Sequence, residues 1–141
     1  MSRVINPNAV GKRRKMLLRA LVLALRELMT QTSPDQTTRD LAAFLVLTLR
    51  EVAATVRETT DAWEKRGYWL KADRFRLEWE WTETLAARLE EALRREDWEA
   101  VSQVAAELFV RLSQVDLPKR HRLGRPWEGA WAKWQAQQAG E

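Results

Sequence analysis

The chain has 141 residues, of which 45% are hydrophobic and 31% charged, a composition typical of one globular domain. It contains no cysteine, which excludes disulfides, thiolate nucleophiles and zinc–thiolate or iron–sulfur sites, and favours a reducing, cytoplasmic setting. The net charge is only +4, but the cations are unevenly distributed along the chain. The distribution of charge is therefore more informative than its sum.

Apolar residues recur at spacings of three and four along almost the whole chain, which predicts helices and gives no support for strands. The first helix is expected to begin at Asn6-Pro7, or only after Gly11, and to end near Gln31. Its apolar stretch over 16–29 is interrupted by charged residues, the first of which is Arg19. A membrane-spanning helix needs about 18 or more uncharged residues, so we predict a core helix and no membrane span.

A second helix is predicted from Ser33 to the residue before Gly67. Ser33 has the character of an N-cap, Pro34 suits the first turn, and Gln36 is placed to close a capping box. Gly67 can adopt the left-handed conformation that ends a helix. A third helix is predicted over 72–93, where small and apolar residues form one unbroken heptad stripe.

A fourth helix is predicted over 98–115, with Asp97 as its N-cap and Pro118 preventing its extension. Beyond Pro126, three tryptophans fall on one face of a short tail helix: Trp127, Trp131 and Trp134. This face is expected to pack on the rest of the chain, with Leu77 and Trp81 as the candidate surface. Trp81 should lie about 200° around the third helix from Trp79.

Short connections between these helices favour an all-α, up-down-up-down four-helix bundle. Residues 1–117 would form the bundle, and residues 118–141 a basic loop and a tryptophan-rich tail helix that belong to the same single domain. In this topology the start of the first helix, the turn after the second and the segment after the fourth all lie at one end.

Those three segments, 1–15, 61–76 and 116–126, contain 14 cations and four carboxylates, a net charge of +10 that leaves −6 for the rest of the chain. Cations that contact phosphates, beside aromatic rings that stack on bases, are typical of proteins that bind single-stranded nucleic acid. We therefore expect a small non-enzymatic protein that binds a polyanion, most simply DNA or RNA. The predicted phosphate contacts are Lys12, Arg13, Arg14, Lys15, Lys65, Arg66, Lys71, Arg74, Lys119, Arg120, Arg122 and Arg125, and the predicted stacking platforms are Tyr68 and Trp69.

Two alternatives remain open from the residues alone. The first two helices are apolar over most of their circumference, which favours an adaptor protein that uses them for self-association or for a protein partner. Glu58-x-x-Asp61 and Glu80-x-x-Glu83 have a spacing that could hold magnesium for nucleotide hydrolysis, although such pairs are common on exposed helices. The single histidine, His121, lies in a cationic loop, so we predict no metal, no cofactor and no catalytic residue.

Overall fold

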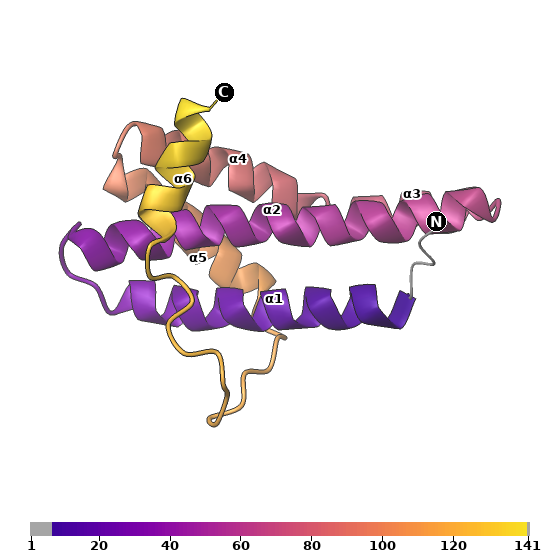
Figure 1. Cartoon of the computed structure of the whole chain (residues 1–141), viewed down its shortest axis with the longest axis horizontal. Coiled ribbons are helices and arrows are strands. Elements are labelled where there is room, and N and C mark those ends of the chain that lie inside the picture. Colours follow the sequence, from indigo (N-terminus) through magenta and orange to yellow (C-terminus); the bar gives the residue numbers. More distant parts are fainter. Residues whose placement is uncertain (1–6, 141) are drawn as a thin grey trace.

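The computed structural model describes residues 7–140; residues 1–6, which include the cation Arg3, and residue 141 lie outside the described part. Within that part the chain forms helices and no strand, which confirms the predicted all-α class. The helices, shown in Figure 1, are α1 (Pro7–Met29), α2 (Gln36–Lys65), α3 (Trp69–Trp79), α4 (Trp81–Arg94), α5 (Trp98–Arg111) and α6 (Ala130–Ala139).

The central element is α2, the longest helix, which packs against α1, α3, α4 and α6. In Figure 1, α1 runs below it and the α3–α4 segment runs above it. This arrangement is compatible with an up-and-down bundle. Because four helices pack against α2, the apolar surface around it is covered by other parts of the same chain.

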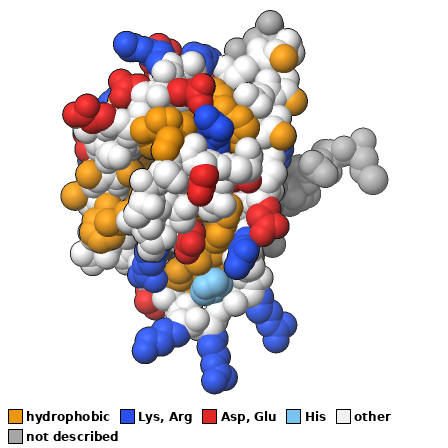
Figure 2. All heavy atoms as spheres, turned by 90° about the vertical axis from the view of Figure 1, so that its left-hand side faces the viewer, with side chains coloured by type: hydrophobic (Ala, Val, Ile, Leu, Met, Phe, Trp, Pro, Cys, Tyr) orange, Lys and Arg blue, Asp and Glu red, His pale blue; other side chains and the backbone are white. Residues whose placement is uncertain are grey.

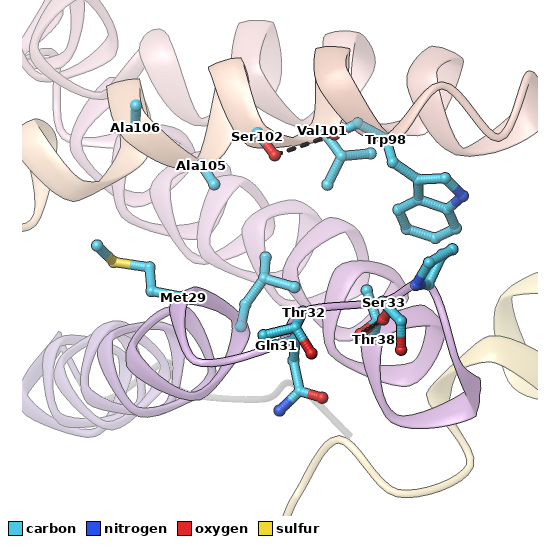
Figure 3. Close-up of a pocket in the computed structure, with 12 residues that line it drawn as sticks. Met29, Gln31, Thr32, Ser33, Thr38, Trp98, Val101, Ser102, Ala105 and Ala106 are labelled. Carbon is cyan, nitrogen blue, oxygen red and sulfur yellow. Dashed lines mark hydrogen bonds between the residues drawn. The ribbon is translucent and has the colours of Figure 1, made fainter.

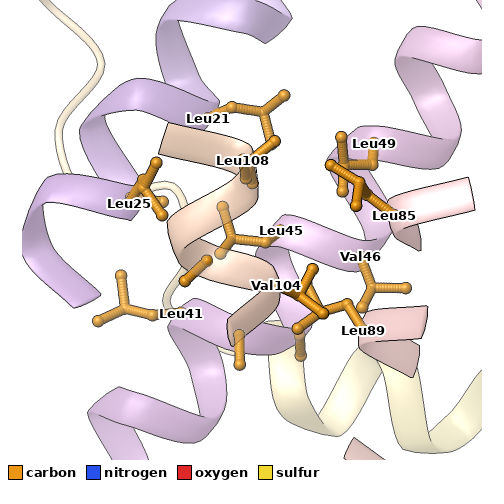
Figure 4. Close-up of a cluster of buried hydrophobic side chains, with 14 of the residues drawn as sticks. Leu21, Leu25, Leu41, Leu45, Val46, Leu49, Leu85, Leu89, Val104 and Leu108 are labelled. Carbon is orange, nitrogen blue, oxygen red and sulfur yellow. The ribbon is translucent and has the colours of Figure 1, made fainter. Parts of the chain in front are cut away.

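The bundle is built around leucines and valines from α1, α2, α4 and α5 (Figure 4). Leu21, Leu45 and Leu89 are completely buried, and each comes from a different helix. Burying one such side chain stabilises the fold by about 1.5–3 kcal/mol relative to exposure. The heptad and helical spacing seen in the sequence therefore corresponds to one continuous core.

The predicted third helix is interrupted at Glu80, which separates α3 from α4. The Thr82 hydroxyl donates to the Trp79 carbonyl at 2.8 Å, a local bond that competes with regular helical pairing. The rings of Trp79 and Trp81 stack with 6.0 Å between centroids. Sequence spacing placed Trp81 about 200° around the helix from Trp79, but the two side chains bend toward each other and their rings are in contact.

One of the two predicted helix N-caps is confirmed, and the other lies two residues further along the chain. Asp97 caps α5 as predicted, accepting from the Ala100 amide at 3.1 Å. The cap of α2, however, is Asp35, which accepts from the Thr38 amide at 3.0 Å, and the predicted capping box at Ser33 is not formed. Ser33 contributes only its carbonyl, which accepts from the Thr38 hydroxyl at 2.7 Å. Asp35 is the better acceptor because its charge also complements the helix dipole.

The fourth predicted helix is shorter than expected, since α5 ends at Arg111 rather than at Val115. The amide of Ser113 pairs with the Val110 carbonyl, so the last turn tightens and the chain leaves the helix. As Figure 1 shows, α5 ends near the middle of the molecule, and the following loop passes below α1 before returning to α6. One half of the bundle is therefore formed by α1, α2 and α3 without α5.

The tail helix α6 packs on α2. It does not cover Leu77, whose surface is 71% exposed, so the predicted docking surface is wrong. The attachment is partly polar: the buried carboxylate of Asp40 accepts from the amides of Gly129 and Trp131, at 3.3 and 3.0 Å. Asp40 thus satisfies the free amides at the start of α6 from a neighbouring helix, a docking device that sequence spacing does not reveal.

Candidate nucleic-acid interface

The end of the molecule at which α1 begins also carries the C-terminal half of α2 and the α2–α3 turn (Figure 1). Arg13 on α1 pairs with Glu58 on α2 at 2.6 Å, three residues before the second basic segment begins. We call this region, residues 10–15 together with 55–79, the basic end. Antiparallel packing of α1 and α2 therefore brings together cations that are more than forty residues apart.

A Schellman motif shapes the tip of the basic end. Gly67 has a φ of 80°, a left-handed conformation that costs glycine little. Its amide donates to the Glu64 carbonyl at 2.9 Å, and the Tyr68 amide donates to the Trp63 carbonyl at 2.9 Å. Both bonds fix the direction in which the chain leaves α2. The backbone of Tyr68, and with it the start of α3, is thereby held in place.

The aromatic residues after this turn face solvent. The side chain of Tyr68 is 52% exposed and that of Trp69 60% exposed, and the neighbouring Leu70 is also exposed. They border a shallow groove of about 770 Å³ that Trp63 and Phe75 also line. The two inner rings pack edge to face at 5.1 Å between centroids. The outer rings are thus available to a ligand, while the inner rings close the end of the core.

Arg14 does not belong to the ligand-facing set that the sequence predicted. Its guanidinium donates to the Thr55 hydroxyl and carbonyl, both at 3.0 Å, and to the Thr59 hydroxyl at 2.6 Å. Its Cζ atom lies 4.9 Å from the centroid of the Phe75 ring. Burial, with the neighbouring charge of Arg13, lowers the pKa of Arg14. Arg14 is therefore a structural link between α1, α2 and α3.

Four further cations at this end have partners within the chain, one of which is Arg57, paired with Glu83 of α4. Arg13 pairs with Glu58 but stays half exposed, and the Lys71 ammonium lies 4.5 Å above the Trp63 ring. Arg76 pairs with Glu64 and, at 2.9 Å, with Asp73. Exposed ion pairs are worth about 0–1 kcal/mol, so Arg13 and Lys71 can exchange these partners for a phosphate at low cost.

The remaining cations of the basic end are exposed and make no ion pair or hydrogen bond with any side chain of residues 7–140. They come from α1, from the end of α2 and from α3, at the end of the molecule that also carries the exposed rings of Tyr68 and Trp69. These cations are Lys12, Lys15, Lys65, Arg66 and Arg74.

The third basic segment does not join the basic end, and the prediction of one shared end is wrong in this respect. The loop after α5 passes below α1, away from the end at which α1 begins (Figure 1). Its cations project beside the single histidine at the lower edge of Figure 2. Leu117 and Trp127 are buried and hold the two sides of the loop against the core. The separate patch, here called the loop patch, consists of Lys119, Arg120, Arg122 and Arg125.

Two of the four carboxylates that suggested magnesium binding form ion pairs with arginines of the chain. Glu58 pairs with Arg13, and Glu83 pairs with Arg57 at 2.5 Å. In the described part of the chain, no group of three or more His, Asp or Glu side chains is arranged to hold a metal ion. Across the same residues, no helix combines the length and the apolar character needed to cross a bilayer.

Comparison of the chain with family models, with curated proteins and with solved structures finds no match. Sequence reasoning placed Tyr68 and Trp69 among the candidate residues, but it did not anticipate the groove or the exposure of Leu70. Both depend on how α3 packs against α2, and residue spacing contains no signal for that packing.

Proposed function

We propose that this chain is a non-enzymatic helical protein that binds single-stranded nucleic acid at its basic end. One observation carries the proposal: five exposed cations that make no ion pair within residues 7–140 lie at the same end of the molecule as two exposed aromatic rings. Cations alone would suit any polyanion, and exposed rings alone would suit many partners. The combination favours a ligand that offers phosphates and stacking faces together.

In this proposal the cations of α1 and α2 contact the sugar–phosphate backbone. Lys12 and Lys15 stand one turn apart on α1, and Lys65 with Arg66 stands beside the tip of the α2–α3 turn. Tyr68 and Trp69 would stack on unpaired bases. Because every base has a π face, binding of this kind is tolerant of sequence and favours single strands over duplexes.

The loop patch is not part of the proposed site for a short strand. It lies apart from Tyr68 and Trp69 and offers no exposed aromatic ring of its own. Arg125 also forms a long ion pair with Glu128, at 3.9 Å. We therefore assign the short-strand site to the basic end alone, and a longer polyanion would be needed to reach both patches.

The test is fluorescence anisotropy with labelled single-stranded DNA and RNA of mixed sequence, at low ionic strength. Replacing Lys65 and Arg66 together by glutamine should weaken binding, and Trp69→Ala should weaken it by about tenfold or more, since stacking contributes about 1–3 kcal/mol per base. A double variant with glutamine at Arg95 and Lys133 is the control, because these exposed cations lie outside the basic end. No binding at low salt, or equal losses in both double variants, would contradict the proposal.

The second candidate function is that of an adaptor protein, and the outer face of α3 favours it. Leu70 and Leu77 are both largely exposed on this short helix. An exposed leucine offers neither a charge for a phosphate nor a ring for base stacking, whereas it can pack against an apolar surface on a partner protein. Leu77→Ser should leave nucleic-acid affinity unchanged if the first proposal is right.

A further inference from the structure

The outer face of α1 is basic along most of its length. The buried side chains of this helix, such as Leu21 and Leu25, lie on the side that packs against α2, which is above α1 in Figure 1. On the opposite side, cations recur at intervals of three, four and seven residues, the spacing of one helix face. This row, here called the α1 strip, consists of Lys12, Lys15, Arg19 and Arg26.

The second half of the α1 strip contains cations that the basic end does not include. Arg26 is exposed and Arg19 half-buried, and neither side chain forms an ion pair or a hydrogen bond with residues 7–140. The only carboxylate within Pro7–Met29 is Glu27, in the last turn. Another side of the end of α1 borders a pocket of about 310 Å³ whose described lining contains no charged residue (Figure 3). The positive charge is therefore confined to the outer face.

The loop patch lies on the same side of the molecule as the α1 strip. The loop after α5 passes below α1, away from α2 (Figure 1), and its cations project from that lower edge (Figure 2). All four cations of the loop patch are exposed. At 1.5 Å per residue, the α1 strip extends for about 21 Å along the helix axis. It begins at the basic end and follows the side from which the loop patch projects.

We propose that a single-stranded nucleic acid longer than the basic end leaves Tyr68 and Trp69 and runs along the outer face of α1 to the loop patch. The inference rests on the proposed function, which it extends from a local site to a path. Arg19 and Arg26 contact phosphates along α1, and the loop patch contacts phosphates further on. Because contacts to phosphates carry no sequence information, the path is the same for strands of any sequence.

A membrane surface is the other polyanion that a row of cations could bind. A helix that lies in a membrane interface needs a large apolar face beside its cations. Between the cations of the α1 strip stand Met16, which is exposed, and Leu23, which is partly buried against the core. One exposed methionine is too little apolar surface to enter a bilayer. The strip therefore favours the phosphates of a flexible strand.

Fluorescence anisotropy with mixed-sequence strands of two lengths tests the path. About 6 nucleotides should occupy the basic end, whereas about 20 exceed the roughly 4–16 nucleotides of one binding module. The longer strand should show the steeper salt dependence, by about 0.7 in the slope for each added phosphate contact. Glutamine at Arg19 and Arg26 together should lower the magnitude of the slope by about 1.4 for the longer strand and leave the shorter strand unchanged. The control is glutamine at Arg95 and Lys133, which are exposed and lie outside the strip.

The results distinguish the path from the site on which it rests. Equal slopes for the two lengths, or an equal loss for both strands in the Arg19 and Arg26 variant, would overturn the path and leave the short-strand site intact. Failure of both strands to bind would contradict the proposed function itself. Binding to vesicles that contain phosphatidylserine, if the same two substitutions abolished it, would assign the strip to a membrane and overturn the proposal.

The far end of the path has its own test, because the chain contains no native cysteine. His121→Cys places a thiol in the loop patch, and Gln137→Cys places an exposed thiol on α6, across α2 from α1 (Figure 1). A strand of about 20 nucleotides with a thiol-reactive group at either end should label the His121→Cys variant and not the Gln137→Cys variant. The shorter strand should label neither. Equal labelling of the two variants by the longer strand would contradict the path.

Discussion

The guanidinium of Arg14 lies over the ring of Phe75, with 4.9 Å between Cζ and the ring centroid, and it simultaneously hydrogen-bonds Thr55 and Thr59 on α2. One side chain of α1 therefore connects three helices in the half of the bundle that α5 does not reach. Replacing Arg14 by methionine should lower the free energy of unfolding by about 2 kcal/mol, because the hydrogen bonds and the cation–π contact are lost together.

Urea unfolding followed by circular dichroism measures this effect. Arg13→Met is the matched control, because the Arg13–Glu58 pair is half exposed and should contribute about 0–1 kcal/mol. Equal destabilisation by the two variants would show that Arg14 is an ordinary surface cation.

Asp40 should determine whether α6 stays attached. Its carboxylate, only 8% exposed, accepts from the amides of Gly129 and Trp131. In Asp40→Ala these amides lose their acceptor, which should cost about 1–2 kcal/mol, as the loss of a helix cap does. Amide hydrogen exchange should speed up in residues 127–139 and much less in α2. Protection of α6 at the wild-type level would show that its apolar face alone holds it.

Glu90 joins the tail to the bundle at a second place. It is 12% exposed and accepts from Arg50 at 2.9 Å and from the Trp134 indole at 3.0 Å. Glu90→Gln keeps the size but removes the charge, and should lower stability by about 1–3 kcal/mol while shifting tryptophan emission to longer wavelength. Glu91→Gln is the control, because its ion pair with Arg94 is a longer contact of 3.6 Å. An unchanged emission spectrum in Glu90→Gln would contradict this assignment.

Glu107 should make the stability of the fold depend on pH. A hydrogen bond from Arg88, followed by the charge of that residue, lowers the pKa of the Glu107 carboxyl below its usual value of 4.5. A group whose pKa falls on folding stabilises the fold above its unfolded pKa, and this contribution disappears as pH falls through the folded pKa. The pair is exposed, so the loss should be small. Carboxyl NMR titration should place the pKa of Glu107 below 4.5, and Arg88→Gln should raise it toward that value.

Much of the local structure could be predicted from short-range patterns. Pro7 at the start of α1, Asp97 as the cap of α5 and Gly67 at the end of α2 each act through their own backbone, so their effect needs no tertiary contact. The apolar spacing likewise predicted the all-helical fold, because burial of one helix face is what produces that spacing.

The arrangement of the basic segments was predicted only in part. Lys12, Lys65 and Arg66 gather at one end because α1 and α2 are long and antiparallel. Lys119 and its neighbours do not, because α5 stops at Arg111 and the loop then follows its own buried anchors, Leu117 and Trp127. Nor does helical periodicity distinguish a cation that packs inside, such as Arg14, from one that projects into solvent. That difference depends on which ring and hydroxyl groups the neighbouring helix presents.

The salt dependence of binding tests the central claim most directly, because it counts the phosphates that the protein contacts. Five phosphate contacts should give a slope of about −3.5 in a plot of log affinity against log salt for single strands, or about 100-fold weaker binding between about 50 and 200 mM. Glutamine at Lys65 and Arg66 should reduce the magnitude of the slope by about 1.4 for a short oligonucleotide. Glutamine at Lys119, Arg120 and Arg122 should leave it unchanged. A slope that responds to the loop patch but not to Lys65 and Arg66 would contradict the assignment of the basic end as the nucleic-acid interface.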